Sequence, residues 1–399
     1  MSELDYKNFF TRHLLTKKKA NLNIAIVCYP TFGGSGVVAT ELGIALSSKG
    51  HDIHFVTYHQ PVRLEALRHP NIHFHEVNVP DYPLFKYQPY ELALSSRLLE
   101  VIKLHNIDVL HVHYAIPHAY AAYMAKKMLE DEGIRIPIVT TLHGTDITLV
   151  GSHPFYRPAV TFSINHSDRV TAVSESLKQD TLRLFEIKTN IKVIPNFIDV
   201  EKIESAGMPC DRSLLAAKEE KILTHISNFR PLKRIMDVIH IFEKVADKIP
   251  SKLMMVGEGP EKIKAIRYVE QNGLEDRILF LGNSNEIDKI LCFSDLFLLP
   301  SEQESFGLSA LEAMAHGVPV ISSDAGGISE VNKDGYSGFI SPIGDLEAMS
   351  ENALKLLLDS ELHLKFKQQA KAQASLFSLQ KIVGQYEEIY SDAIASIQY

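Results

Sequence analysis

Short apolar stretches alternate with longer segments of helical composition along the chain after residue 20. In the first half, the stretches that we expect to form strands are 23–28, 53–58, 72–77, 109–114, 138–143 and 169–173. The helices expected between them are 37–48, 91–105 and 120–132. Because these strands are apolar and separated by helices, the pattern predicts an α/β fold with a parallel, doubly wound sheet.

The alternation is interrupted after the apolar stretch 191–194 and then starts again. The later strands are expected over 222–226, 253–256, 278–281, 296–299 and 318–322. A chain of 399 residues is too long for one ordinary core, so we expect two Rossmann-like domains that face each other across a cleft. The predicted domains are 21–195 and 196–378, after an extension over 1–20. The amphipathic tail, 379–399, is expected to form a helix that crosses back onto the first domain.

Composition and charge narrow the class of protein. The chain is 45% hydrophobic and 23% charged, as in soluble globular proteins, and its formal charge of -8 argues against general nucleic-acid binding. No apolar run approaches the ~20 residues needed to span a bilayer, and the first residues do not begin a signal peptide, so we expect a cytoplasmic protein. The basic patch 17–19 is interpreted as a solvated linker, with steering of an anionic lipid or substrate as the alternative.

The cysteines give a prediction about redox state. Cys28, Cys210 and Cys292 are far apart in the sequence and show no metal-ligand spacing. Two of them sit in or beside apolar segments, so we expect inert core thiols, which fits a reducing compartment.

Loops that follow the strands are where ligands bind in such sheets. The glycine-rich loop 33–36 can wrap an anion, but it lacks the GxGxxG spacing, which disfavours a dinucleotide oxidoreductase. His143 ends a strand and precedes a glycine, so it can face the cleft, or else it is a structural histidine. His111, His113 and His118 suggest a metal site, but no acidic or cysteine partner lies at ligand spacing, and we expect no metal.

The segment 301–312 carries the most suggestive chemistry. A strand over 296–299 precedes it and a helix is expected over 306–316, so a helix N-terminus is available to dock a phosphate. Glu304 and Glu312 are eight residues apart, which is about two helical turns. Both side chains are therefore expected near one face, from which they can reach the ligand site at the helix N-terminus. Carboxylates there accept hydrogen bonds from sugar and ribose hydroxyls, whereas the plainer alternative is two solvated glutamates.

A second strand-end loop, 227–234, carries three cations, Arg230, Lys233 and Arg234. Arginine can engage a phosphate through two parallel hydrogen bonds, so this loop is a candidate phosphate site. Ordinary surface charges are the alternative.

With these motifs, the chain resembles the retaining glycosyltransferases of family 4, which have the GT-B fold of two Rossmann-like domains. The resemblance covers nearly the whole chain after residue 20, and its most specific part is the Glu-x7-Glu spacing of Glu304 and Glu312. Further segments resemble family members that transfer N-acetylglucosamine from UDP-N-acetylglucosamine to L-malate, in the first step of bacillithiol biosynthesis. Those segments are 28–36, 113–118, 141–146 and 227–230.

The resemblance implies roles for individual residues. The implied catalytic residues are His143, Glu304, Arg230 and Lys233. The implied donor-binding residues are Gly34, Gly36, Arg230, Lys233, Asn283, Glu304, Phe306, Gly307, Leu308 and Glu312. Many relatives separate the arginine and the lysine by five positions whereas the interval here is three, so Arg234 can share the phosphate role. The resemblance also implies same-face substitution, in which the donor phosphate helps to deprotonate the acceptor hydroxyl.

The last predictions concern the residues that bind the acceptor and the need for a cofactor. Malate carries two carboxylates, so its pocket needs hydrogen-bond donors and positive potential, and the candidates are Ser35, Tyr114, Thr141 and Arg63. With no Asp-x-Asp motif, catalysis without metal or cofactor is expected. Partners are expected to be the two small substrates, without nucleic acid or membrane insertion, and a homo-oligomer is left open. The alternatives are a family member with a lipid or glycan acceptor, a UDP-N-acetylglucosamine 2-epimerase and a catalytically silent UDP-sugar sensor.

Overall fold

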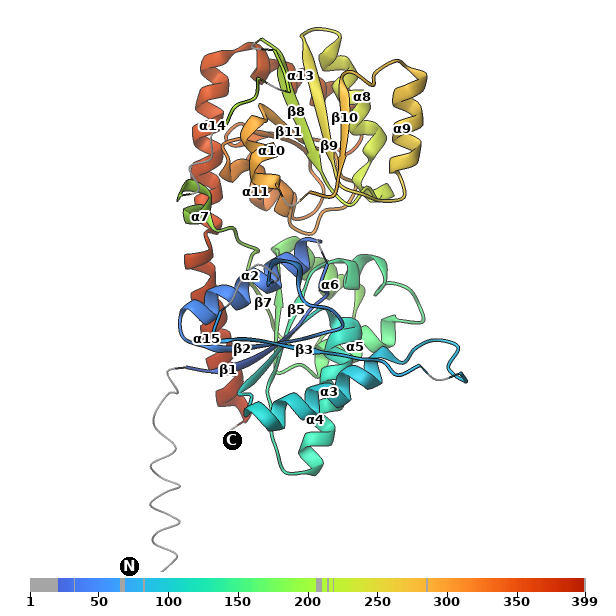
Figure 1. Ribbon diagram of the computed structural model, residues 1–399, viewed down its shortest axis with the longest axis vertical. Helices are drawn as coiled ribbons and strands as arrows, with labels where there is room; N and C mark the ends of the chain where they lie inside the picture. Colours follow the sequence, from blue (N-terminus) through green and yellow to red (C-terminus); the bar gives the residue numbers. More distant parts are fainter. Residues whose placement is uncertain are drawn as a thin grey trace, which may run out of the picture.

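The computed structural model describes residues 21–31, 33–64, 69–81, 83–205, 210–213, 215–217, 219–284 and 286–397. The predicted extension 1–20, with its basic patch, lies outside the described residues. The chain forms two α/β domains stacked along the long axis of the molecule (Figure 1). Each domain contains one parallel sheet, so the predicted fold class is confirmed.

The first sheet has seven parallel strands in the order β3-β2-β1-β4-β5-β6-β7. They are β1 (Asn23–Val27), β2 (Asp52–Thr57), β3 (Ile72–Glu76), β4 (Val109–His113), β5 (Ile138–Leu142), β6 (Arg169–Ala172) and β7 (Ile191–Val193). Its helices are α2 (Gly34–Ser48), α3 (Tyr90–His105), α4 (Tyr120–Asp131), α5 (Arg157–Asn165) and α6 (Glu175–Leu184). Every strand predicted in this half is present. Helix α2 begins at Gly34, earlier than predicted, so part of the glycine-rich loop is the first turn of a helix.

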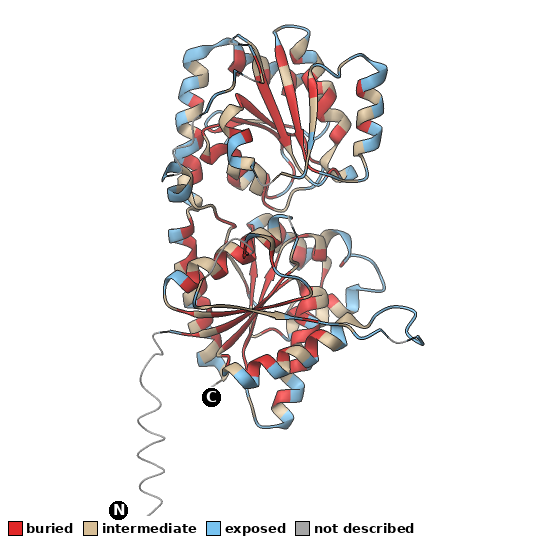
Figure 2. Ribbon diagram, in the orientation of Figure 1, coloured by how far each residue is buried: buried red, intermediate tan, exposed pale blue. Residues whose placement is uncertain are grey.

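The second sheet has six strands in the order β10-β9-β8-β11-β12-β13. They are β8 (Lys221–Ile226), β9 (Ser251–Val256), β10 (Ile278–Gly282), β11 (Leu296–Leu299), β12 (Val320–Ser323) and β13 (Gly338–Ser341). Its helices are α8 (Ile235–Ala246), α9 (Lys262–Gln271), α10 (Ile287–Phe293), α11 (Leu308–Ala315), α12 (Ile328–Val331), α13 (Leu346–Leu358) and α14 (Ser360–Ala374), and the short α7 (Val200–Ser205) follows the first domain. The sequence pattern missed β13, which is only four residues long and pairs at the sheet edge with β12. The central strands of both sheets are almost wholly buried, whereas the edge strands β3 and β10 are largely half-buried (Figure 2).

Helix α15 (Leu379–Ile397) returns from the second domain to the first. Its apolar face, which includes Ile382, Val383 and Tyr386, packs with residues of β1 and α2 in one buried cluster. Tyr390 is fully buried, and its hydroxyl lies 2.8 Å from Nδ1 of His111 on β4. Among the described helices, α15 included, none combines the length and apolarity needed to cross a membrane.

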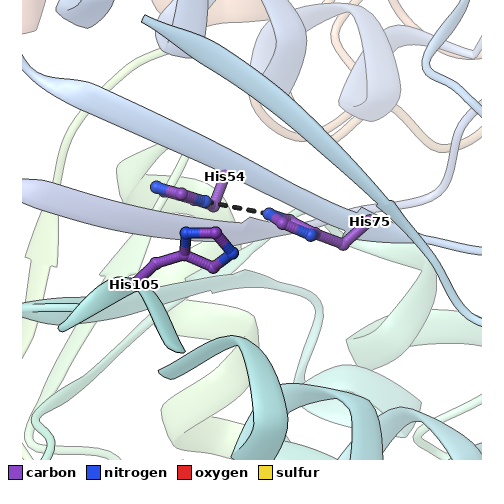
Figure 3. Close-up of side chains that lie close together, drawn as sticks. All are labelled: His54, His75 and His105. Carbon is purple, nitrogen blue, oxygen red and sulfur yellow. Dashed lines mark hydrogen bonds between the residues drawn. The ribbon is translucent and has the colours of Figure 1, made fainter. Parts of the chain in front are cut away.

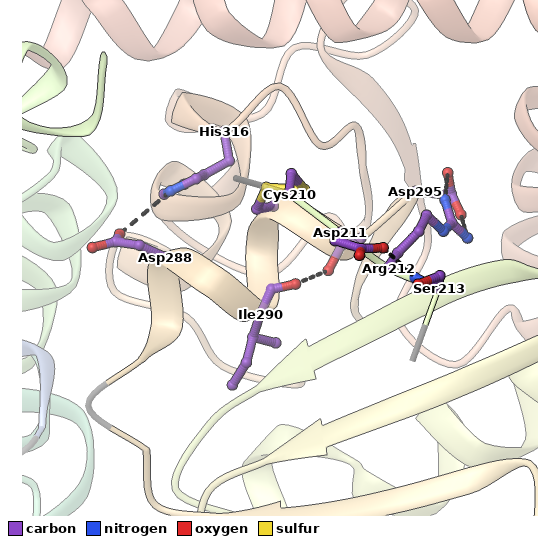
Figure 4. The surroundings of a disulfide bond; sticks show 10 residues. Cys210, Asp211, Arg212, Ser213, Asp288, Ile290, Asp295 and His316 are labelled. Carbon is purple, nitrogen blue, oxygen red and sulfur yellow. Dashed lines mark hydrogen bonds and ion pairs between the residues drawn. A yellow bond between two sulfur atoms is a disulfide. The ribbon is translucent and has the colours of Figure 1, made fainter. Parts of the chain in front are cut away.

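The prediction of core thiols for the two cysteines in apolar segments is confirmed for Cys28 and wrong for Cys292. Cys28 is free and buried as expected, but Cys210 and Cys292 form a disulfide that joins the segment before β8 to α10 (Figure 4). Next to it, Arg212 makes a two-pronged ion pair with Asp295, at 3.1 and 2.9 Å. The pairing could not be recognised from the sequence, because 82 residues separate the two cysteines and only the fold brings their Cα atoms within 5.9 Å.

Candidate functional site

A cavity of about 890 Å³ lies between the two domains. Tyr114 and His143 reach it directly after β4 and β5 of the first sheet, and Arg230 reaches it from the loop after β8. The segment 303–308 contributes from the loop after β11. Strands of both sheets thus present their carboxyl ends to one space, which is where α/β sheets bind ligands. The volume falls within the range typical of small-molecule sites.

Most of the candidate residues line this cavity, and five do not. The lining includes Gly34, Ser35, Tyr114, His143, Arg230, Lys233, Glu304, Phe306, Gly307 and Leu308. The candidates outside the lining are Gly36, Arg63, Thr141, Asn283 and Glu312.

The cations of the 227–234 loop are divided between the cavity and the neighbouring helix. The ammonium group of Lys233 donates to Oε2 of Glu304 at 2.5 Å, and both side chains are largely buried. Arg230 lines the cavity and has no ion-pair or hydrogen-bond partner among the described side chains. Arg234 turns away and pairs with Asp237 on α8. Two of the three cations, Arg230 and Lys233, therefore line the cavity, and Lys233 is already paired with Glu304.

The loop before α11 exposes the N-terminus of that helix to the cavity. Gly307 adopts a left-handed conformation, with φ of 95°, directly before the first helical residue. A Cβ atom at this position would also press on the terminal methyl of Ile328, but that side chain can shift, so the positive φ is the main reason for glycine here. The ring of Phe306 is buried in the core against Phe377, which fixes the backbone at the cavity wall. The first N–H groups of α11 are thereby offered to an anion.

The helical boundary corrects one expectation about the glutamates. Because α11 starts only at Leu308, Glu304 belongs to the preceding loop, and it does not share a helix face with Glu312. Glu304 lines the cavity, whereas Glu312 lies on α11 outside the lining, at the boundary between the domains.

Glu312 is surrounded by charges from both domains. Nη2 of Arg63 in the first domain lies 4.0 Å from its carboxylate, and Nη1 of Arg63 donates to Glu41 at 2.6 Å. Burial raises the pKa of Glu312 from 4.5 to about 7, since the attraction of Arg63 is outweighed by desolvation and by the repulsion of Asp288 and Glu41. Arg63 therefore supports Glu312 rather than the cavity region that holds Ser35 and Tyr114.

The three remaining candidates also lie outside the cavity lining. Thr141 is fully buried within β5, where its hydroxyl bonds Nε2 of His111 and the hydroxyl of Thr171, each at 2.8 Å. Gly36 lies inside α2, where a Cβ atom would collide with the carbonyl oxygen of Tyr29. Asn283 is exposed and follows β10 at the edge of the second sheet. The sequence placed these residues at strand ends but could not show which way each faced.

His143 is held in the cavity wall as a neutral imidazole. Its Nε2 lies 2.8 Å from Nδ1 of His113, and the two rings stack. Burial, together with the charge of His118, lowers the pKa of His143 to about 3, so the ring is uncharged at neutral pH. A neutral imidazole can accept a hydrogen bond at one nitrogen while it donates at the other.

Asp146 was part of a recognised motif but was not singled out as a site residue. Its carboxylate is buried and accepts backbone N–H bonds from Ala115 at 2.8 Å, Gly144 at 3.0 Å and His143 at 3.3 Å. Burial raises its pKa to about 6 although these hydrogen bonds lower it. Asp146 thus ties the loops after β4 and β5 together and fixes the backbone of His143. An aspartate two residues after a glycine at a strand end was the signal that could have identified it.

Tyr114 links the loop after β4 to the first turn of α2 within the first domain. Its backbone has a φ of 84°, and its hydroxyl donates to Oγ of Ser35, on the first turn of α2, at 2.7 Å. Burial raises the pKa of Tyr114, while the Ser35 hydrogen bond and the charge of Arg230, from the other domain, lower it. The phenol, the serine hydroxyl and the guanidinium all line the same cavity.

The domains also touch beside the cavity, at the N-terminus of α6. The carboxylate of Glu330, on α12, accepts the backbone N–H groups of Glu175 at 2.9 Å and Ser176 at 2.8 Å. Ser174 donates through its hydroxyl to the carbonyl oxygen of Ser305 at 2.6 Å. These hydrogen bonds join the two domains beside the cavity, and they could not be recognised from the sequence.

Comparison with known proteins agrees with this geometry. Residues 32–202 match the family model described as Glycosyltransferase Family 4, and residues 211–373 match the one described as Glycosyl transferases group 1. The chain is 48% identical to N-acetyl-alpha-D-glucosaminyl L-malate synthase of Bacillus anthracis, over 94% of this chain and 97% of that relative.

Solved structures have the same architecture. A glycosyltransferase from Rickettsia africae superposes with a TM-score of 0.75 at 21% identity, over 94% of this chain and 99% of that one. The Anabaena protein Alr3699/HepE, crystallised with UDP and glucose, also gives a TM-score of 0.75, at 20% identity, over 93% of this chain and all of the other. At these identities the likeness shows the fold alone, and it confirms the predicted GT-B architecture.

Proposed function

Because the chain belongs to the family 4 glycosyltransferases and has their two-domain GT-B fold, we propose that it transfers N-acetylglucosamine from UDP-N-acetylglucosamine to the hydroxyl of L-malate. The reaction retains the anomeric configuration and gives GlcNAc-α-L-malate and UDP, the first step of bacillithiol biosynthesis. The observation that carries the proposal is the 48% identity, over nearly the full length of both chains, to a relative with that name.

The second domain supports binding of the sugar nucleotide. Arg230 and Lys233 supply two positive charges at one side of the cavity, and the N-terminus of α11 supplies backbone donors at another. A diphosphate needs both kinds of group, and charge that develops on the departing UDP is stabilised by them. Glu304 is an acceptor for donor-sugar hydroxyls. The hydrogen bond from Lys233 orients this carboxylate until the sugar binds.

Two of the three described acidic residues that line the cavity are engaged in ways that favour a route without a covalent sugar intermediate. Glu304 is engaged by Lys233, and Asp146 is buried and accepts three backbone N–H bonds, so neither of these two is presented as a free nucleophile. The third, Glu91, lies on α3. In the proposed reaction, the malate hydroxyl attacks the anomeric carbon from the face that UDP leaves, and its proton passes to the departing phosphate. The neutral His143 hydrogen-bonds the donor sugar without competing for the phosphate charge.

The first domain offers the acceptor site. Ser35 and Tyr114 provide hydroxyl groups, and the N-terminus of α2 provides backbone donors beside them. Together with Arg230 across the cavity, these groups are the donors and positive potential that a dicarboxylate requires. Thr141 and Arg63 are no longer candidates for this role, since both are engaged elsewhere.

The test is release of UDP from UDP-N-acetylglucosamine with L-malate, with D-malate and without acceptor, in buffer that contains a chelator. Release that requires L-malate supports donor, acceptor and metal-independent catalysis together. Formation of UDP-N-acetylmannosamine without acceptor would instead indicate a 2-epimerase. Binding of UDP without turnover under any of these conditions would overturn the malate assignment and leave a UDP-sugar sensor or a different acceptor.

A further inference from the structure

Four histidines gather at one end of the first sheet, far from the cavity. His54 lies near the start of β2, His73 and His75 lie on the edge strand β3, and His105 is the last residue of α3. The strand register pairs His54 with His73, so these side chains and that of His75 share one face of the sheet, the face that α3 covers. The chain continues from His105 directly into β4, which places the cluster toward the amino ends of the strands. The cavity lies at their carboxyl ends.

Three of these rings converge on one point. The ligand nitrogens of His54, His75 and His105 all lie within 4.8 Å of one another (Figure 3). Nδ1 of His54 lies 2.9 Å from Nε2 of His75, and the centroid of the His105 ring lies 4.5 Å from that of His54 and 4.9 Å from that of His75. Three nitrogens bound to one zinc ion at about 2.0–2.1 Å lie roughly 3.3 Å apart, so only small side-chain rotations separate this arrangement from a metal site.

The other nitrogen of His54 provides an independent indication of a ligand. His54 is almost fully buried, yet its Nε2 has no hydrogen-bond partner among the described residues. The carboxylate of Asp52 lies just beyond hydrogen-bond distance, with Oδ2 at 3.7 Å from that nitrogen. The other oxygen of Asp52 lies 2.8 Å from Nε2 of His73. If Nδ1 of His54 bound a metal, Nε2–H would point to a carboxylate, which is the usual support of a metal-ligating histidine.

Access to the cluster also suits a metal. His75 and His105 are half-buried, which leaves a path for an ion and a position for a water ligand.

We propose that His54, His75 and His105 bind one divalent transition-metal ion of the zinc class, with Asp52 orienting His54 from behind. Three imidazole nitrogens and a water suit Zn²⁺, whereas Mg²⁺ and Ca²⁺ prefer oxygen ligands. The ion would join the edge strand β3 to β2 and to the end of α3. Its role is structural, because the site lies at the opposite end of the strands from the cavity.

The test uses the full-length protein, stripped of metal with a chelator and titrated with Co²⁺, whose visible d–d absorption reports tetrahedral coordination. We expect one Co²⁺ per chain, displaced by one equivalent of Zn²⁺, and a melting temperature that Zn²⁺ raises. His75→Gln and His105→Gln should each weaken Zn²⁺ binding at least 10-fold, and Asp52→Asn should weaken it by about 10- to 100-fold. The two half-buried histidines give independent tests if one variant fails to fold.

The matched control is His59→Gln, which removes an exposed histidine just beyond β2 and should leave Zn²⁺ affinity unchanged. The proposal is overturned if the wild type shows no tetrahedral Co²⁺ spectrum, or if His75→Gln and His105→Gln bind Zn²⁺ as tightly as the wild type does. Equal loss of affinity in His59→Gln would also overturn it, because binding would then be a general property of surface histidines.

Discussion

The substitution Glu312→Gln should make the protein more stable at neutral pH and change how its stability depends on pH. Glu312 is only 21% exposed, and its pKa is raised from 4.5 to about 7, chiefly by burial. Between pH 4.5 and about pH 7, Glu312 has lost its proton in the unfolded chain but keeps it in the folded chain. Stability therefore falls as pH rises through this window, and the stabilising effect of the neutral acid is fully present only below about pH 4.5.

The size of the effect follows from the pKa. Each pKa unit corresponds to about 1.4 kcal/mol, so the rise from 4.5 to about 7 corresponds to roughly 3 kcal/mol as an upper limit. Glutamine has nearly the same shape as the neutral acid but cannot ionise. The variant should match the wild type near pH 4.5 and exceed it in unfolding free energy by up to this amount at pH 8.

The assay is urea unfolding of the ligand-free protein at several pH values between 4.5 and 8, followed through the transition of the second domain. Glu302→Gln is the control, because this exposed glutamate lies just after β11 and should give a curve parallel to that of the wild type. A difference between Glu312→Gln and wild type that is independent of pH would refute the reasoning. So would a variant that is less stable than the wild type at pH 8, since Arg63 would then stabilise a charged carboxylate more than burial destabilises it.

Three further substitutions test the cavity and the contact between the domains. Glu304→Ala should lower kcat by about 100-fold or more while the far-UV spectrum stays unchanged, and wild-type turnover in the folded variant would remove this carboxylate from the site. Lys233→Ala should weaken UDP binding by about 10- to 100-fold in calorimetry, since a charge-assisted hydrogen bond is lost, whereas Arg234→Ala should leave the affinity unchanged because that guanidinium already pairs with a helix residue. Glu330→Gln should weaken the contact between the domains by about 1–2 kcal/mol, because its charge caps the N-terminus of α6, and small-angle scattering should show a larger radius of gyration. An unchanged radius would mean that the capping contact does not hold the two domains together.

Particular residues show how far the sequence was informative about the site. Tyr114, His143, Arg230 and Glu304 follow buried strands, and in a parallel sheet every such position lies at the same edge, so their convergence on one cavity was predictable. Thr141 is also near the end of a strand, but its side chain points into the core, where Thr171 and His111 bond it. Which face a strand-end side chain takes depends on the register of its neighbours, and one sequence does not contain that register.

The sequence was even less informative about which charged side chains form ion pairs. Arg230, Lys233 and Arg234 lie within five positions and could not be ranked by type or spacing. The fold separates them, because Lys233 meets Glu304 from a loop 71 residues away while Arg234 is taken up by Asp237 in the next helical turn. Likewise, Cys210 and Cys292 looked like separate thiols until the second domain brought them together.

The sequence by itself determined the alternation of strands and helices, because burial in a parallel sheet requires apolar strands and periodic helices, and both are local patterns. It also determined that α15 is amphipathic and therefore needs another surface to cover its apolar face. Only the tertiary structure decided which side chains share a cavity, which cations stay free for a ligand and which histidines converge. Those properties depend on distances between residues far apart in the chain, and such distances are set by packing rather than by any local pattern.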